Sequence, residues 1–331
     1  MPYIPERRPE ITEAPPEGIS REKQKAPAGI HKYLRPALLC FFALLAVYGA
    51  VRLIVYGKDF SGSRQTGQEL KQIYDGTGAV SEEQPAVPEQ THTPVVTISP
   101  APTAASTPKP TPVITEGKLP EAVPYPDNPD LKVPERFKRL RKKSGYIIGW
   151  LSLDGVDEAV ALKDNSYFLN HDATGKKSSN GAIFLDESVN LLSRPYTIWL
   201  YGHNMKSGNM FGKLKKFLDR NYLFRHRIVH FDSLYEEGTY AVFAAAEIST
   251  VPGTARYYDL WSLDTRDREA REKAIEGLVR LAAFDALLDV RAEEQILVLV
   301  TCIDQDTDRL VVAARRLREG ETEEHLTLRV R

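Results

Sequence analysis

Cysteine is scarce in this chain: among 331 residues only Cys40 and Cys302 carry a thiol. Cys40 lies in a long apolar segment near the N-terminus, so the two thiols cannot form an intramolecular disulfide if that segment lies in lipid and Cys302 lies outside it. Because exported cysteines usually pair, an unpaired Cys302 is either a buried, inert core thiol or a reactive one. The neighbouring residues must distinguish these two interpretations.

A strong net charge and metal-binding patterns are also lacking. The 44 Lys and Arg residues nearly balance the 45 Asp and Glu residues, which gives no indication of a nucleic-acid or acidic-polymer partner. No Cys-x-x-Cys pair is present, and His226 and His230 lie on a predicted loop and strand without a plausible partner. Metal binding is therefore not predicted.

One long hydrophobic run indicates a membrane anchor. Residues 1–35 are polar and of mixed charge, and we expect no packed structure in this cytoplasmic tail. Residues 36–56 are nearly all apolar, and as a helix they would span roughly 30 Å, about the thickness of a bilayer core. Lys and Arg residues before the run predict that the N-terminus stays in the cytoplasm. The run begins too late for a cleaved signal peptide, so a single-pass transmembrane signal anchor is favoured over a buried core helix.

A segment rich in proline and threonine follows the apolar run. Residues 57–78 are polar and could continue the helix briefly, but residues 79–133 have too many prolines for a helix and too few large apolar groups for a core. We therefore expect residues 57–133 to form a disordered stalk. Extended at about 3.1 Å per residue, the stalk could reach on the order of 150 Å from the membrane. A protease that cuts within it should release the folded domain.

The folded part, residues 134–331, is predicted to be mainly β. Proline in the first turn favours a short helix over residues 134–144, and apolar residues at helical spacing favour another helix within 265–289. Eight segments of β-branched or aromatic residues, separated by Gly, Asn, Asp and Ser, predict strands. They are residues 146–153, 159–163, 182–185, 196–201, 227–233, 239–248, 295–301 and 309–314. This pattern is typical of a closed barrel or a sandwich.

Cys302 stands at the end of a predicted buried strand. The apolar run Ile296–Val300 precedes it, an acidic loop at 304–308 follows it, and Arg309 opens the next strand. A strand end holds the backbone firmly while the side chain meets solvent. If the two strands are neighbours, the Arg309 guanidinium would favour a thiolate and stabilise a developing oxyanion. The acidic loop is not an EF-hand, because Arg309 and Arg315 occupy the positions that require Gly and Glu.

Two histidines compete for the role of general acid. His203 follows the predicted strand 196–201 and precedes a polar turn, whereas His171 lies within the segment 168–172. A histidine at a strand end is usually structural, although imidazole is the commonest general acid–base. A thiol, an imidazole and a guanidinium are sufficient for acyl-transfer chemistry.

Several segments, taken in order, resemble the sortases and class B sortases in particular. They are Gly149-Trp150-Leu151, residues 164–172, residues 181–186, Tyr201-Gly202-His203-Asn204-Met205, Met210-Phe211-Gly212-Lys213-Leu214 and Thr301-Cys302. The resemblance runs from about residue 134 to residue 316 and implies a sortase-like closed β-barrel with an N-terminal helix and an inserted helix. It also implies that His203, Cys302 and Arg309 form the catalytic trio. Family members often have serine where this chain has Val300.

The resemblance implies a membrane-anchored cysteine transpeptidase whose catalytic domain is extracytoplasmic. The Cys302 thiolate is expected to attack the Thr carbonyl in an Asn-Pro-x-Thr-like sorting signal near the C-terminus of a surface protein. Arg309 and the backbone N–H after Cys302 would hold the oxyanion, and His203 would protonate the departing amine. An amine of a cell-wall precursor would then resolve the thioester, and no cofactor is implied.

Three alternatives to this function stay open. A pilin-polymerising sortase would use a lysine amine as acceptor, and a cysteine protease would transfer the acyl group to water. An inactive binding module on a stalk is the third, but it would have no need for His203, Cys302 and Arg309 together.

Overall fold

A computed structural model of the chain describes residues 30–77, 117–303 and 307–328. Most of the predicted cytoplasmic tail and part of the acidic loop, residues 304–306, lie outside the described residues. Two compact units make up the chain, Met1–Val55 and Tyr56–Arg331. The helices are α1 (Ile30–Asp75), α2 (Glu135–Lys143), α3 (Arg220–Arg225), α4 (Arg268–Leu281) and α5 (Glu323–Leu328), with 3-10 helices η1 (Tyr167–Leu169), η2 (Leu214–Leu218) and η3 (Leu260–Asp264).

The first unit contains the apolar half of α1. The window Leu38–Val55 has a mean hydropathy of 2.4, and none of it is buried against other parts of the chain. Among the described residues, this is the one helical window long and apolar enough to cross a bilayer, judged by length and composition. The helix is longer than the predicted span of residues 36–56 at both ends.

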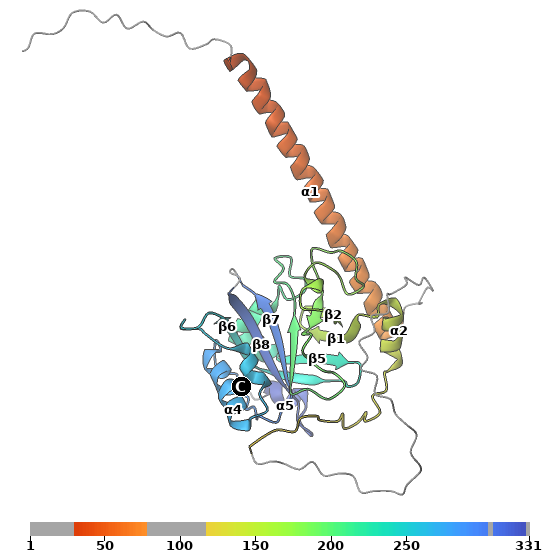
Figure 1. The fold of residues 1–331 in the computed structure, drawn as a ribbon, viewed down its shortest axis with the longest axis vertical. Helices are drawn as coiled ribbons and strands as arrows, with labels where there is room; N and C mark the ends of the chain where they lie inside the picture. Colours follow the sequence, from red (N-terminus) through yellow and green to blue (C-terminus); the bar gives the residue numbers. More distant parts are fainter. Residues whose placement is uncertain (1–29, 78–116, 304–306, 329–331) are drawn as a thin grey trace, which may run out of the picture. The chain divides into compact units, whose positions relative to one another are not determined.

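The second unit is built on a closed barrel of eight strands (Figure 1). They are β1 (Ile147–Leu153), β2 (Val156–Ala161), β3 (Ile183–Leu185), β4 (Thr197–Tyr201), β5 (Ile228–Ser233), β6 (Thr239–Ser249), β7 (Ile296–Cys302) and β8 (Asp308–Arg316). Their order around the barrel is β1-β2-β3-β4-β7-β8-β6-β5, and β5 closes it by pairing with β1. The predicted closed β-barrel is therefore confirmed, and each predicted strand is present within a few residues of its expected bounds.

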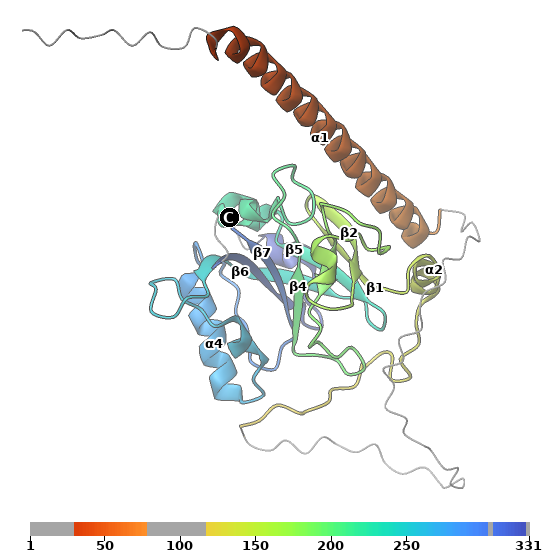
Figure 2. The same cartoon turned by 45° about the horizontal axis from the view of Figure 1, so that its top comes forward.

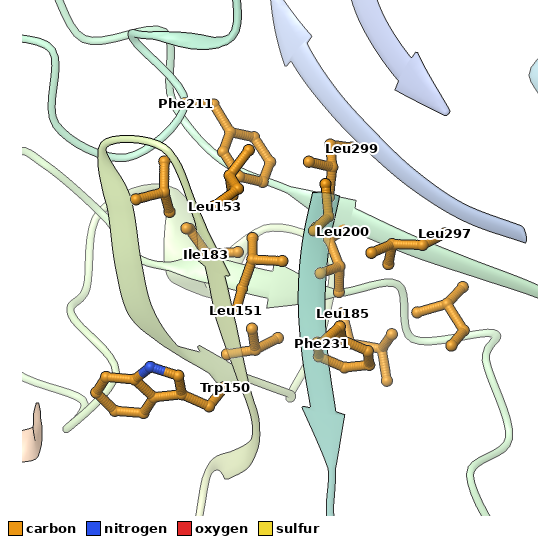
Figure 3. Packing of buried hydrophobic residues seen from close by; sticks show 14 of the residues in the cluster. Trp150, Leu151, Leu153, Ile183, Leu185, Leu200, Phe211, Phe231, Leu297 and Leu299 are labelled. Carbon is orange, nitrogen blue, oxygen red and sulfur yellow. The ribbon is translucent and has the colours of Figure 1, made fainter. Parts of the chain in front are cut away.

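Apolar side chains pack on both faces of part of the barrel wall. The interior cluster includes Leu151, Ile183 and Leu297 (Figure 3). A second cluster, which includes Leu278 and Val298, lies outside the wall between the strands and α4. A strand that is buried on both faces reads as a continuous apolar run rather than an alternating one. This double burial explains the unbroken apolar sequence of β7.

The inserted helix α4 is shorter than the prediction of residues 265–289. Its N-cap is Asp267, whose carboxylate accepts a hydrogen bond from the N–H of Ala270 at 2.8 Å. The helix ends at Leu281 because Ala282 is extended and the N–H of Ala283 donates to a carbonyl oxygen of β6 at 2.9 Å. In Figure 2, α4 and α2 lie on opposite sides of the barrel.

The beginning of the predicted stalk belongs to the folded unit instead. Helix α1 continues to Asp75, and Leu70 and Ile73 in its last turns are 3% and 2% exposed within the main core. Tyr74 stacks on Trp150 of β1 with ring centroids 4.5 Å apart. These residues recur at the i, i+3, i+4 spacing of an amphipathic helix, so residues 63–75 form a docked segment rather than part of a stalk.

Polar contacts along the docked segment add to its apolar contacts. Lys71 forms an ion pair with Asp157 of β2 at 3.1 Å, and Glu69 forms one with Lys143 of α2 at 2.6 Å. Burial raises the pKa of Glu158, whose carboxylate lies beside α1, to about 7. The helix therefore covers charged groups of β2 as well as apolar ones.

The end of the predicted stalk also lies on the barrel. The N–H of Leu119 donates to the carbonyl oxygen of Arg266 at 2.7 Å, and the side chain of Tyr125 is buried. The Tyr125 hydroxyl donates to the carbonyl oxygen of Leu191 at 3.0 Å. Of the predicted stalk, only residues 78–116 lie outside the described residues.

Candidate active site

The strand topology brings the three predicted site residues to one edge of the barrel. Strands β4 and β7, both labelled in Figure 2, are parallel neighbours, and their register pairs Tyr201 with Val300. His203 follows the end of β4 by two residues, and Cys302 is the last residue of β7. Strand β8 runs antiparallel to β7 and places Arg309 directly opposite Cys302. The prediction that the strands carrying Cys302 and Arg309 are neighbours is confirmed.

These three residues line one cavity of about 350 Å³. Its other lining residues are the apolar Leu169, Phe184, Trp261 and Val300, the polar Asn165, Asp186, Tyr201 and Thr301, and Gly202. A mostly apolar hollow with a few convergent polar groups is the usual form of a ligand site. A larger hollow of about 650 Å³ lies along the docked segment and contains none of the three.

Cys302 has an exposed side chain, in contrast to the buried residues that precede it in β7. The alternative prediction that Cys302 is buried in the core is therefore wrong. Side chains alternate along a strand, so Cys302 continues the series Ile296, Val298 and Val300, which faces the outer cluster beside α4. Its thiol is free and accessible from the cavity.

The imidazole of His203 is fixed by a backbone carbonyl. Its Nε2 lies 2.6 Å from the carbonyl oxygen of Leu169, in η1. Because a carbonyl oxygen can only accept, Nε2 carries a proton and Nδ1 is the nitrogen that can gain or lose one. The turn at Gly181, with φ of +63°, packs against this ring, and a Cβ there would lie 3.0 Å from its Cδ2.

His171, the competing candidate, lies at a different place. Its ring stacks on Tyr167 with centroids 4.1 Å apart, and its Nδ1 lies 2.9 Å from the carbonyl oxygen of Tyr167. His171 does not line the cavity that contains Cys302. The geometry therefore favours His203 as the imidazole of the site.

Backbone contacts hold the Arg309 side chain near the end of β7. Its Nη1 donates to the carbonyl oxygen of Asp308 at 3.0 Å, and the N–H of Ile303 donates to the same oxygen at 3.1 Å. The backbone N–H that follows Cys302 is thus already engaged. This corrects the expectation that it would hold an oxyanion, and leaves the Arg309 guanidinium as the cationic donor on this side of the cavity.

A polar network lies deeper in the cavity. The buried carboxylate of Asp186 accepts a hydrogen bond from Nδ2 of Asn165 at 3.0 Å. Burial, and next the charge of Asp186, raise the pKa of Tyr201, while the positive charge of Arg309 opposes that shift. Tyr201 therefore keeps its hydroxyl proton as a hydrogen-bond donor. All three residues lie in segments singled out from the sequence, but only contacts between distant segments reveal the network.

Two further polar groups flank the thiol. The side-chain amide of Asn204 donates to the carbonyl oxygen of Cys302 at 3.0 Å. Thr301 is one of the residues that line the cavity, but its hydroxyl is buried and has no hydrogen-bond partner among the described residues. The sequence alone could reveal this contact of Asn204 only if the register between the strands that precede Asn204 and Cys302 were known.

This chain is similar in sequence and in fold to known sortases. The sortase domain model matches residues 158–317. Sortase B of Listeria monocytogenes is 27% identical over 195 residues, which cover 57% of this chain and 74% of the relative. The crystal structure of sortase B from Bacillus anthracis in complex with AAEK2 is 24% identical, with a TM-score of 0.55, and the match covers 78% of this chain and 97% of that one.

A solved Staphylococcus aureus sortase B–substrate complex is also similar. It is 26% identical with a TM-score of 0.50, and the match covers 56% of this chain and 87% of that one. Together with the closed barrel, these findings show that the chain belongs to the sortase family and is a class B sortase. It is therefore a cysteine transpeptidase for surface proteins.

Proposed function

We propose that Cys302, His203 and Arg309 are the catalytic residues, and that they act on a sorting signal near the C-terminus of a surface protein. The observation that carries this assignment is the convergence of the three side chains on one cavity from β4, β7 and β8. A thiol nucleophile needs an acid for the leaving group and a donor for the oxyanion, and these side chains supply both functions.

The first half of the reaction forms a thioester. The Cys302 thiolate attacks the carbonyl carbon of the scissile peptide bond, and the carbonyl oxygen becomes an oxyanion opposite Arg309. As the C–N bond breaks, the proton on Nδ1 of His203 passes to the departing amine, and the acyl group remains on sulfur. Nδ1 suits this role because Nε2 is held by the Leu169 carbonyl.

The second half of the reaction returns the enzyme. An amine attacks the thioester carbonyl and gives up a proton to His203, while Cys302 leaves as the thiolate and a new amide forms. Family members often have serine where this chain has Val300. Because Val300 carries no hydroxyl, we expect its side chain to make no hydrogen bond to an Asn-Pro-x-Thr-like signal.

The group that accepts the acyl chain distinguishes cell-wall anchoring from pilin polymerisation and from proteolysis. The chain should be incubated with a sorting-signal peptide and either a cell-wall-type peptide amine or a pilin-derived lysine peptide, and the products resolved by mass spectrometry. Preferential amide formation with the first amine supports cell-wall anchoring, and preference for the second supports pilin polymerisation. Hydrolysis in the presence of saturating amine would indicate a protease instead.

We propose that the apolar window of α1 anchors the protein in the cell membrane with the barrel outside. The chain continues from Val55 through α1, in which the hydroxyl of Ser63 forms a hydrogen bond with the hydroxyl of Ser178 at 2.8 Å. Thr77 and Gly117, the described residues on either side of residues 78–116, both belong to the second unit. We therefore expect the part of α1 that follows Val55, rather than residues 78–116, to join the anchor to the barrel.

A cut within residues 78–116 is expected to leave the barrel on the membrane. A specific protease site introduced there should yield two fragments that co-sediment with membranes, because Leu70 and Ile73 hold the docked segment in the core. Ile73→Asp buries a charge at this contact and should release the nicked barrel into the supernatant. Gln72→Asp, on the exposed side of the same turn, should not. A barrel released from the otherwise unaltered nicked chain would restore the stalk interpretation.

Replacement of Arg309 by lysine is expected to lower kcat/KM by at least ~100-fold, the scale of losing one oxyanion donor. Arginine offers two donors in a rigid fork, whereas lysine is a compact point charge. The loss should persist across the pH range in steady-state assays. If Arg309→Lys retains near-normal activity, or recovers when the pH is raised, Arg309 supplies charge alone.

A further inference from the structure

Asn204 occupies a special place where β4 and β7 separate. The last paired residues of the two parallel strands are Tyr201 and Val300, and the N–H of Gly202 still donates to the carbonyl oxygen of Val300 at 3.4 Å. In a parallel ladder such donors recur every second residue. The next bond would run from the backbone N–H of residue 204 to the carbonyl oxygen of Cys302.

The backbone of Asn204 does not make that bond. The chain turns away at His203, and Asn204 pairs with Met210 in an isolated antiparallel bridge. The N–H of Phe211 donates to the carbonyl oxygen of His203 at 3.0 Å and closes the same turn. This turn frees the His203 side chain from the strand and directs it to the cavity.

The side chain of Asn204 replaces the missing backbone donor. Its Nδ2 lies 3.0 Å from the carbonyl oxygen of Cys302, the acceptor that the continuing ladder would have used. The backbone of β4 can therefore turn away before His203, while the Asn204 side chain keeps a hydrogen bond to Cys302, the nucleophile on β7. The opposite side of the Cys302 peptide is tied to β8 through the Ile303 N–H and the Asp308 carbonyl.

We infer that Asn204 is a positioning residue of the transpeptidase, which sets the distance between the Cys302 thiol and the His203 imidazole by extending the β4–β7 ladder with its amide. This inference rests on the proposed catalytic roles of Cys302 and His203. A small displacement of reacting groups is costly in rate while substrate binding is little affected. Asn204 contacts no reacting atom itself, so its effect should appear in kcat and not in KM.

Three variants of the full chain test this role. Asn204→Leu keeps the size of the side chain and removes the donor, Asn204→Gln keeps the donor on a longer arm, and Asn209→Leu makes the same exchange elsewhere in the same loop. We expect Asn204→Leu to lower kcat roughly tenfold, the scale of one net hydrogen bond, with KM within about twofold. Asn204→Gln should recover part of the loss, and Asn209→Leu should match the unaltered chain.

A second readout does not need a substrate. Hydrogen exchange at the Ile303 amide, followed by mass spectrometry, should be faster in Asn204→Leu than in Asn209→Leu, because one of the two ties on this peptide is gone. If the unaltered chain forms no amide product, the proposed function is rejected. The exchange comparison would still test whether the Asn204 side chain holds the Cys302 carbonyl. Unchanged kcat in Asn204→Leu, an equal loss in Asn209→Leu, or unchanged Ile303 exchange would each overturn the positioning role.

Discussion

Replacement of Cys302 by alanine is expected to abolish both cleavage of a sorting-signal peptide and amide formation. The loss should reach roughly 10⁴-fold or more, the scale on which removal of a catalytic nucleophile acts. No other thiol lines the cavity, and neither His203 nor Arg309 can form the acyl intermediate in its place. Turnover should be followed by mass spectrometry of peptide products.

The fold should survive this substitution. Cys302 is exposed at a strand end, and substitutions at such positions usually change stability by only about 0.5 kcal/mol. The thermal midpoint of Cys302→Ala should therefore match that of the unaltered chain. Cys40→Ala provides a matched control, since it removes the only other thiol and should retain full turnover. Normal cleavage by a folded Cys302→Ala variant would remove this thiol from the mechanism.

Replacement of His203 by alanine is expected to lower kcat/KM by roughly 10²- to 10⁴-fold, the contribution of a positioned general acid. The imidazole lies at the end of β4 beside the Cys302 strand, and its Nδ1 is the proton-carrying position left open by the Leu169 contact. A leaving amine that receives no proton is expelled slowly. A substrate with a better leaving group should therefore restore part of the rate.

His171→Ala is the matched control for the imidazole. This residue stacks on Tyr167 and does not line the cavity, so its removal should leave most of the activity. Steady-state kinetics of both variants with the same peptide separate the two assignments. If His171→Ala proves the more damaging substitution, or if the improved leaving group fails to help His203→Ala, the role of general acid does not belong to His203.

Much of the barrel could be predicted from the sequence because its strands carry a strong local signal. The apolar run of β7 reflects burial on both faces, and the polar turns mark the strand ends. The length of α4 could not be predicted in the same way. Leu288 recurs at helical spacing with the residues of α4, yet the chain leaves the helix after Leu281 because the Ala283 N–H bonds to β6.

The docked segment shows how composition can hide a packed helix. The prolines of residues 79–133 favour one continuous stalk, whereas the apolar contacts of the preceding helix with the barrel come from Leu70, Ile73 and Tyr74, in a segment that is otherwise polar. Their apolar surface is too small to stand out from the polar residues around it. The packing of Tyr74 also depends on Trp150, which lies 76 residues away in the sequence.

Some features of the candidate site could be predicted from the sequence, and others could not. The positions of Cys302 and Arg309 follow from adjacent strands joined by a short loop, which sequence patterns describe well. The contacts that hold His203 and Cys302 do not follow, because His203 and its partner Leu169 are 34 residues apart, and Cys302 and its partner Asn204 are 98 residues apart. Backbone carbonyls are the acceptors in both cases, and every residue type supplies one. The acceptor of the Ile303 N–H is also a backbone carbonyl, that of Asp308, which no side-chain pattern reveals.

The most direct test of transpeptidation through Cys302 is the intact mass of the protein during turnover. After mixing with a sorting-signal peptide in the absence of amine, the chain should gain the mass of the N-terminal peptide fragment, located on Cys302 by peptide mapping. Added acceptor amine should remove this adduct and produce the corresponding amide at the same rate. Cleavage of the peptide without any adduct on Cys302, or an adduct that amine cannot resolve, would contradict the account.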